Sequence, residues 1–219
     1  MDLIKDLFKC SPGGRMTGDE RREQILAAAV ELFSQRGFSG TTTKQIAIAS
    51  GVSEAMVFRH FATKDTLYDA ILESKGGENG GKQFPWVENE ALREALAAKD
   101  DYGVFFHLGL HALNRHRQDE GFMRLLFYSA LEDHWLAERF FSEFVSKIYE
   151  FIGAYIAERQ RDGAIRELEP GLIVRAYLGM LIHHSLNNML WDKKLKIMDV
   201  SNEEAAKQFA GILLDGIRK

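Results

Sequence analysis

The stretch TTKQIAIASGVSEAMVFRHF, residues 42–61, decides the fold because it places a glycine between two very short helical patterns. If the first helix begins at Thr43, Ala47 lies where two crossing helices come closest, and its small side chain permits that approach. Gly51 falls in the turn, where a positive φ is cheap only for glycine. The residues expected to point inward and lock the two helices together are Ile46, Val52 and Val57.

The second helix of this pair, residues 54–61, is expected to lie in the major groove of DNA. Ser53 can cap the helix through its hydroxyl, and the short side chains at its start let the backbone sit deep enough to read base edges. Small residue, turn glycine, cap and inward apolar residues together are typical of a DNA-binding helix-turn-helix, although an ordinary helical hairpin shows parts of the pattern. The residues predicted to face DNA are Thr42, Thr43, Ser53, Glu54, Ala55, Met56, Phe58, Arg59, His60 and Lys64.

Three of these residues carry a charge that suggests a role. Arg59 can bond to guanine edges or to a phosphate, and Glu54 can accept from cytosine N4 or simply favour the helix N-terminus. Lys64 stands at the start of the next helix, where its charge and the free N–H groups predict a phosphate clamp. Other interpretations stay open for Phe58, as a core residue, and for His60, as a surface histidine without a ligand.

Met56 either contacts a thymine methyl or makes no contact, and the hydroxyls of Thr42 and Thr43 are expected to flank the DNA backbone. Overall charge gives this interpretation no support, because the net charge is −4. Even residues 15–75 carry eight basic and eight acidic side chains. The prediction of DNA binding therefore rests on local geometry and local charge.

The composition is that of an ordinary globular chain of 219 residues, with 46% hydrophobic and 27% charged residues. Only three prolines occur, and apolar residues recur at three- and four-residue spacing, so we predict an all-α fold. Cys10 is the only cysteine, which excludes an internal disulfide and suits a reducing cytosol. No stretch of about 18 apolar residues is present, and the N-terminal MDLIKDLFKC is too short and charged for a secretory signal. We expect a cytoplasmic protein with no membrane partner.

Glycine-rich stretches and caps divide the chain into three parts. We predict a leader over residues 1–16, a helix-turn-helix domain over residues 17–75 and a larger helical domain for ligand binding and dimerisation over residues 76–219. Thr17 and Glu20 have capping-box spacing at the first clear helix, which ends at Gly37. Beyond the glycines at 76–81, helices are expected at 87–98, 101–117, 120–131, 135–161, 170–191 and 202–217.

The stretch ILAAAVELFSQRGFSGTTTKQIAIASGVSEAMVFRHFATKDTLYDAIL resembles the N-terminal domain of the TetR/AcrR family of bacterial transcriptional regulators. The resemblance covers about residues 20–73 and includes the Phe33–Gly37–Phe38 helix end, the threonine run, GVS, FRHF and the Lys64 of TKDTL. Many members carry a tyrosine where Phe58 stands, so a phosphate hydrogen bond expected from that hydroxyl is lost and packing becomes its role. The remaining two-thirds of the chain resembles the family only in layout.

The resemblance implies an all-helical homodimer whose C-terminal domain binds a small molecule. Binding of this molecule is expected to release the dimer from a palindromic operator. One short recognition helix touches few bases, and each good contact contributes only about 1–3 kcal/mol. Two copies related by a twofold axis must therefore fit grooves about 34–36 Å apart, or a multiple of that. A ligand that shifts the spacing weakens binding without touching DNA, provided that it favours the non-binding state.

Aromatic residues are dense between Tyr102 and Tyr155, which predicts an apolar cavity for a hydrophobic or aromatic ligand of unidentified structure. Aromatic residues at helical spacing also make ordinary core, so each single assignment has that alternative. The residues predicted to line the cavity are Phe105, Leu108, His111, Phe127, Tyr128, Trp135, Phe144 and Tyr177. His107 and His111 have a spacing that can hold a metal, but nothing nearby completes a ligand set, so neither a metal nor a cofactor is predicted.

The last two helices are the expected dimer surface, and two of them from each subunit would form a four-helix bundle. The alternative is that the same apolar stripes close the monomer's own core. The residues predicted at the interface are Gly179, Ile182, His183, Leu186, Phe209, Leu213 and Ile217.

Two rival functions differ from a ligand-released repressor. An enzyme that uses the aromatic cavity would need a nucleophile and base, a phosphate-binding glycine loop or a metal set, and the sequence offers none of these, so we predict no enzymatic activity. A DNA-binding regulator without a small-molecule effector is the second rival, and the sequence does not separate it from the ligand-gated form.

Overall fold

The computed structural model describes residues 16–76 and 84–219, and these form helices joined by short connections. Within these two ranges no strand occurs, and the one isolated β-bridge joins Ile165 to Arg218. The predicted all-α fold is confirmed. The helices of the N-terminal part are α2 (Gly18–Arg36), α3 (Thr43–Ala49), α4 (Glu54–His60) and α5 (Lys64–Gly76). Those that follow are α6 (Pro85–Glu88), α7 (Glu90–Ala98), α8 (Asp101–Gln118), α9 (Glu120–Leu131), α10 (Trp135–Phe140), η2 (Phe141–Val145), α11 (Ser146–Arg161), α12 (Pro170–Leu186), η3 (Asn187–Trp191) and α13 (Asn202–Ile217).

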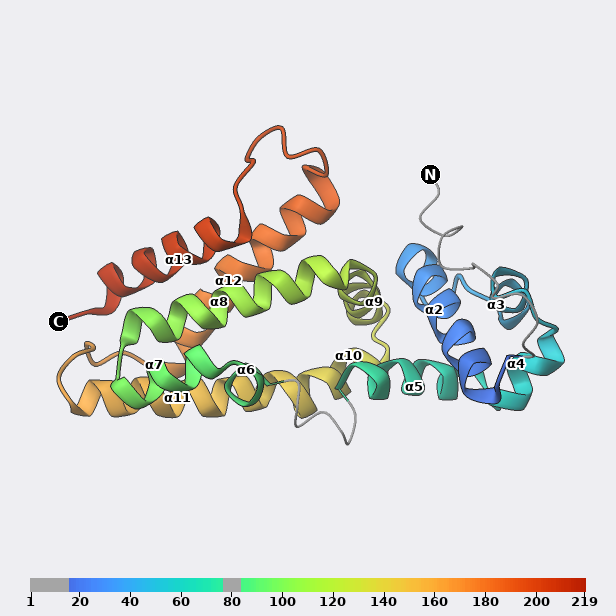
Figure 1. The fold of residues 1–219 in the computed structure, drawn as a ribbon, viewed down its shortest axis with the longest axis horizontal. Helices are drawn as coiled ribbons and strands as arrows, with labels where there is room; N and C mark the ends of the chain where they lie inside the picture. Colours follow the sequence, from blue (N-terminus) through green and yellow to red (C-terminus); the bar gives the residue numbers. More distant parts are fainter. Residues whose placement is uncertain (1–15, 77–83) are drawn as a thin grey trace.

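The predicted leader, except for Met16, and the glycines at 77–81 lie outside the described residues. Helices α2, α3 and α4 group at one end of the molecule, and α5 leads from them to α10 (Figure 1). In the larger part, α8 packs against α7, α12 and α13, while α11 packs against α12. Helix α9 lies at the junction of the two parts, where it packs against α2.

Local signals in the sequence set most helix ends. Thr17 and Glu20 form the predicted capping box, with the Glu20 amide donating to Thr17 Oγ1 at 3.2 Å. Ser201 caps α13 by accepting from the Glu204 amide at 3.1 Å. Gly163, with a φ of +79°, follows α11, and the amides after the helix end bond back to carbonyls in its last turn. These contacts satisfy backbone groups that a helix end leaves unpaired.

Three of the predicted long helices are interrupted. The helix expected at 87–98 is two helices, because Asn89 has an extended backbone and caps α7 through its side chain. The helices expected at 135–161 and 170–191 each contain a π-helical segment, η2 and η3. A π segment adds a residue to the turn and re-aims the side chains that follow it, and periodicity read at a constant 3.6 residues per turn does not reveal it.

Two hydrophobic cores hold the molecule together, and their division differs from the predicted domain boundary. One core lies wholly in the larger part. The other combines α2, α3, α4 and α5 with three residues that come from α9 and α10, namely Phe122, Leu125 and Leu136. Since burial of a large apolar side chain contributes about 1.5–3 kcal/mol, this shared core makes the reading head (residues 17–75) depend on α9 and α10 for its stability.

Candidate nucleic-acid interface and adjoining cavity

The turn between α3 and α4 has the predicted helix-turn-helix geometry. Ile46, Ala47 and Val57 are buried, so the two helices turn their apolar sides toward each other, and α3 also packs against α2. Gly51 has a φ of +66°, and the Val52 amide closes the turn by donating to the Ala47 carbonyl at 2.9 Å. A Cβ at position 51 would meet no atom within 4 Å, so the backbone conformation, and not the space, requires glycine there.

Both helices begin at hydroxyl caps. Thr42 Oγ1 accepts from the Gln45 amide, and the Gln45 side chain accepts from the Thr42 amide in return. Ser53 Oγ accepts from the Met56 amide at 3.2 Å, as predicted. Thr43 Oγ1 donates to Glu54 Oε1 at 2.6 Å, which ties the start of α3 to the start of α4. The Glu54 carboxylate is therefore held within the motif.

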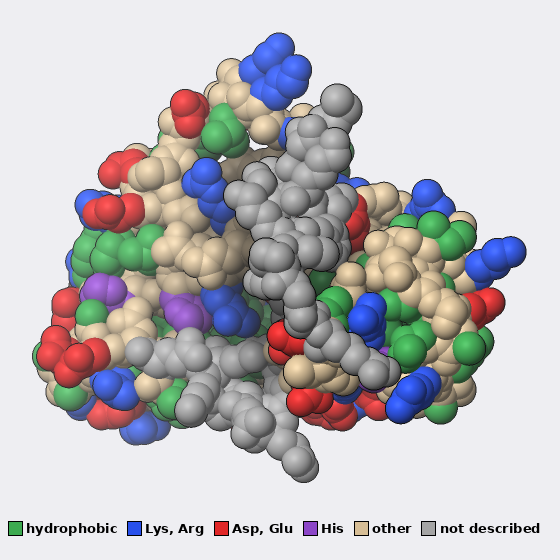
Figure 2. Space-filling view, turned by 45° about the vertical axis from the view of Figure 1, so that its right-hand side comes forward, with side chains coloured by type: hydrophobic (Ala, Val, Ile, Leu, Met, Phe, Trp, Pro, Cys, Tyr) green, Lys and Arg blue, Asp and Glu red, His purple; other side chains and the backbone are tan. Residues whose placement is uncertain are grey.

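The outward face of α4 is accessible. Ser53, Ala55 and Arg59 are exposed, and Met56 and His60 are partly covered. Phe58 is 47% exposed, so it lies on the surface and the core interpretation of this residue is wrong. In Figure 2 several Lys and Arg side chains project from the lobe at the right, beside exposed apolar and acidic groups.

The contacts of Lys64 differ from those expected of the predicted phosphate clamp. Its Nζ donates to the carbonyl of Phe38 at 2.7 Å and to that of Thr41 at 3.1 Å, and it lies 3.9 Å from the centre of the Phe38 ring. Desolvation lowers the pKa of Lys64, while the charges of Asp65 and Glu132 act in the opposite direction. An ammonium has three donors, so two are used inside the protein. Lys64 fastens the loop between α2 and α3 to α5, and at most one N–H is left for a phosphate.

A partly open cavity of about 350 Å³ lies in the larger part, between α8, α9, α10, η2 and α12. Its wall is mainly aromatic and aliphatic, and its polar side chains come from α8 and from Asp119, which follows that helix. The lining residues are Pro85, His111, Ala112, Arg115, His116, Asp119, Phe122, Met123, Leu126, Phe127, Ala130, Ala137, Phe140, Phe141, Phe144, Val145, Ile148, Leu178, Leu181 and Ile182. A wider depression beside α7 is open to solvent and also reaches His111.

Three of the eight predicted cavity residues, His111, Phe127 and Phe144, line this wall. The prediction was wrong for the other five, which lie elsewhere. Phe105, Leu108 and Tyr177 belong to the closed core of the larger part, where the Tyr177 hydroxyl donates to the Phe105 carbonyl. Tyr128 and Trp135 lie at the junction with the reading head, where they donate to the Gln35 carbonyl and to Asp65.

His116 and the aromatic residues Phe122, Phe140 and Phe141 line the cavity wall but are not among the residues predicted there from the sequence. No sequence signal separates the aromatic residues of a cavity wall from those of a closed core, because both follow the same helical spacing. His107 is partly buried with its ring 4.9 Å from that of Phe106, and it does not line the cavity. Among residues 16–76 and 84–219 no three potential ligands group around a metal position.

Residues 25–71 match the family model described as bacterial regulatory proteins, tetR family. The chain belongs to the TetR/AcrR family. The transcriptional activator FasR of Mycolicibacterium smegmatis is 43% identical over 61 residues, 28% of this chain and 28% of that protein. The repressor Rv3405c of Mycobacterium tuberculosis is 45% identical over 65 residues, 30% of this chain and 33% of its own length. The chain thus aligns with about a third or less of each of these relatives.

A solved structure extends the similarity to the whole fold. AibR, crystallised with isovaleryl coenzyme A and operator DNA, is 20% identical with a TM-score of 0.65, and the alignment covers 89% of this chain and 98% of that one. At this identity the likeness establishes the fold alone. Over the described ranges of this TetR-family chain, no helix has both the length and the apolar character to cross a membrane.

The predicted dimer face of this TetR-family chain divides into three groups. Gly179 and His183 are exposed on α12, as an interface requires before association. Leu213 and Ile217 are buried in the monomer's own core, so the prediction for these two is wrong. The other three are partly buried: Ile182 lines the cavity, Phe209 packs against the core, and Leu186 lies near the end of α12.

The exposed apolar residues of α12, η3 and α13 only partly coincide with the predicted face, because Leu172 lies seven residues before Gly179 on the same side of α12, whereas Ile212 lies on another side of α13. Leu172 is 61% exposed, Trp191 69% and Ile212 60%. On α13, Ile212 lies one position before the buried Leu213, which corresponds to about 100° of rotation around the helix. The exposed face of α13 is therefore rotated away from the predicted one.

His116 is a partly buried titratable group of the cavity wall. Its Nδ1 lies 2.9 Å from Ser185 Oγ, which links α8 to α12. Burial, assisted by the charge of Arg115, lowers the pKa of His116 to about 4. The imidazole is therefore neutral at pH 7 and presents no positive charge to the cavity.

We expect the free energy of unfolding to fall as the pH is lowered from 6.5 to about 4, because the unfolded chain takes up a proton at His116 that the folded chain excludes. The slope from this one group is at most about 1.4 kcal/mol per pH unit. Urea denaturation at a series of pH values measures it, and His116→Gln should flatten the dependence. Some slope remains in the variant, since the pKa values of His134 and His184 are also lowered by burial. An unchanged slope in His116→Gln would contradict the assignment.

Proposed function

We propose that the chain is a transcriptional regulator that binds a palindromic DNA operator as a homodimer and responds to a hydrophobic or aromatic small molecule. One observation supports the DNA-binding part above all. Helix α4 is a capped helix of seven residues whose inner face is locked by Val57 and whose outer face presents Ala55 and Arg59 to solvent. A core-forming hairpin has no need of such a face, whereas insertion into a major groove requires it.

A dimer is part of the proposal because one copy of α4 is too small to be specific. Seven residues reach few base pairs, and each good pairing contributes about 1–3 kcal/mol of discrimination. Two copies related by a twofold axis double that contribution and read a palindrome. Helices α12 and α13 belong to the larger part of the molecule, away from α4 (Figure 1), and the apolar residues that they and η3 expose supply a surface for the pairing.

The cavity is the proposed effector site. Its volume of about 350 Å³ is within the range of small-molecule sites, and five phenylalanines contribute to its wall. These rings favour a hydrophobic or aromatic effector over a sugar or a highly charged metabolite. The solved structure of AibR holds isovaleryl coenzyme A and operator DNA together, which supports the combination of the two ligands in this fold.

The effector is proposed to release the operator, so that the unliganded dimer represses. A ligand changes DNA affinity only by its differential affinity for the binding and non-binding states, typically about 1–3 kcal/mol. Helices α9 and α10 each line the cavity on one side and contact the reading head on the other. A shift of these helices would change the separation of the two copies of α4.

Arg59→Ala should weaken binding to operator DNA by about tenfold or more while leaving the fold intact, because Arg59 is exposed and its loss removes a base or phosphate contact. The duplex is obtained by selection from a random pool with the parent chain, and affinities are measured by fluorescence anisotropy at fixed salt. Arg166→Ala, an exposed arginine of the larger part, is the control and should bind like the parent. Equal affinity of Arg59→Ala and the parent would refute the assigned reading face.

Ile212→Glu should convert the dimer to a monomer, because a buried unpaired carboxylate at each of two symmetric positions opposes association. Sedimentation velocity measures the change. Leu168→Glu is a matched control, since Leu168 is also exposed, at 45%, but lies before α12. A monomeric parent, or a variant that stays dimeric, would contradict this part of the proposal.

Thermal denaturation with a panel of lipophilic and aromatic compounds tests the effector. At least one compound is expected to raise the melting temperature of the parent, because a ligand that binds only the folded state stabilises it. Ala112→Trp, which places an indole in the cavity, should abolish that rise. If no compound shifts the parent while DNA binding is present, the regulator without a small-molecule effector becomes the better account.

A further inference from the structure

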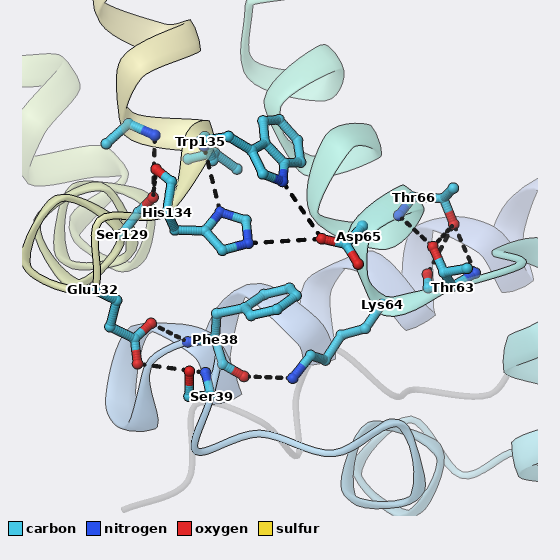
Figure 3. A network of polar contacts seen from close by, with 12 residues as sticks. Phe38, Ser39, Thr63, Lys64, Asp65, Thr66, Ser129, Glu132, His134 and Trp135 are labelled. Atoms are coloured by element: carbon cyan, nitrogen blue, oxygen red, sulfur yellow. Dashed lines mark hydrogen bonds and ion pairs between the residues drawn. The ribbon is translucent and has the colours of Figure 1, made fainter.

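The loop that follows α2 forms a small seat for an anion, and a side chain from the other part of the molecule occupies it. The Phe38 amide donates to Glu132 Oε2 at 2.9 Å, and the Ser39 amide faces Oε1 at 3.4 Å (Figure 3). Successive backbone N–H groups next to a residue with positive φ are a known form of anion-binding concavity. Glu132 is the C-cap residue of α9.

Gly37 makes room for this carboxylate. A Cβ at position 37 would lie 2.6 Å from Glu132 Oε1, closer than any real contact. Gly37 also has a φ of +70°, which side chains rarely adopt. The glycine that ends α2 is thus required twice, once for the turn of the backbone and once for the seat.

Helix α9 contacts the end of α2 at three positions that are four residues apart. Arg124 Nε donates to the Ser34 carbonyl at 3.2 Å, and the Tyr128 hydroxyl donates to the Gln35 carbonyl at 3.3 Å. Glu132 then accepts from the amides just beyond the helix. Arg124 and Tyr128 satisfy carbonyls that the end of α2 leaves unpaired, and the charge of Arg124 is favourable at the negative end of the helix. Glu132 satisfies amides of the loop that follows.

The same loop is fixed from its opposite side by the reading head itself. Lys64 donates to the Phe38 carbonyl, while Glu132 accepts from the Phe38 amide, so both polar groups of this residue are bonded. The Phe38 ring lies between the two parts of the molecule. Its centre is 4.2 Å from the centre of the His134 ring and 4.9 Å from that of the Tyr68 ring. Movement of the α9 end therefore acts directly on the main chain that leads into α3.

The other face of α9 belongs to the cavity. Its residues that line the wall are Phe122, Met123, Leu126, Phe127 and Ala130. A second link between the parts, from Arg139 to Asp69, joins two partly exposed side chains. Such pairs contribute little and adapt to small shifts. The Glu132 contact differs because it holds backbone atoms, which cannot rotate away independently.

We propose that Glu132 is a positioning residue: its carboxylate, seated on the backbone of residues 37–39, sets the angle of the reading head relative to α9. One consequence rests on the proposed function: a ligand that displaces α9 changes the affinity for DNA through this seat. The contact between Glu132 and the loop is a feature of the folded chain, so its role is tested without DNA or ligand.

The first measurement is the distance between the two parts in the full chain. Spin labels are placed at Glu23→Cys on α2 and Glu150→Cys on α11, both exposed positions, in a Cys10→Ser background. Labelled chain is mixed with an excess of unlabelled chain, so that intramolecular distances dominate. A narrow distance distribution is expected for the parent. Glu132→Ala should broaden or shift it, and Glu132→Gln, which keeps an acceptor oxygen, should give an intermediate result.

Glu138→Ala, which removes an exposed carboxylate on α10, is the matched control and should match the parent. Gly37→Ala should resemble Glu132→Ala, because the added Cβ fills the seat. Should Gly37→Ala fail to fold, the two Glu132 variants still decide the question. Identical distributions for the parent and Glu132→Ala would overturn the proposal.

The second measurement is affinity for the duplex selected with the parent chain. Glu132→Ala should bind it about tenfold more weakly, because two seats are lost per dimer and the bound geometry is no longer prepared in advance. Circular dichroism must show a folded variant, so that the effect is one of position. Affinity within twofold of the parent would overturn the proposal. If the parent itself selects no duplex, the proposed function fails, and the spin-label distances alone decide the role of Glu132.

Discussion

The packing of α9 against α2 is the contact on which the rest of this structure depends. Phe122 and Leu125 enter the core of the reading head, and Arg124 and Tyr128 bond to the last carbonyls of α2. A reading head of four helices and about 60 residues buries little apolar surface by itself. Sharing a core with α9 and α10 stabilises it, and the same two helices form part of the cavity wall.

DNA recognition in this chain is a local property. The net charge of −4 would repel a polyanion at long range, and the attraction has to come from the outward face of α4 and the caps around it. Thr43 and Glu54 bond to each other across the turn, so the Glu54 carboxylate is held within the motif by a hydrogen bond. Specific reading then depends on few side chains, which explains why the twofold arrangement matters to the proposed function.

The cavity and the reading head share structural elements, since α9 and α10 belong to both. Met123 and Phe127 lie on the side of α9 that faces the cavity. Arg124 and Tyr128 lie on the side that faces α2. The π segment η2 follows α10 and places Phe141 and Phe144 on the cavity wall. Segments of this kind pack less regularly than α-helix and often mark functional sites.

The sequence by itself determined the features that depend on neighbours along the chain: the capping hydroxyls of Thr17 and Ser53, the turn at Gly51 and the bounds of α9 and α13. These follow from interactions within a few residues, which sequence spacing records directly. Only the tertiary structure decided which aromatic residues line a cavity, since Phe144 and Phe105 have equal claims by spacing.

Tertiary packing also decided that Ile212 lies on the exposed face of α13. It likewise decided that Lys64 donates to carbonyls of the α2–α3 loop. Each of these outcomes depends on partners far away along the chain. Periodicity shows that a helix has an apolar face. The position of the other helices decides whether that face packs into a core, lines a cavity or stays exposed for pairing with a second copy.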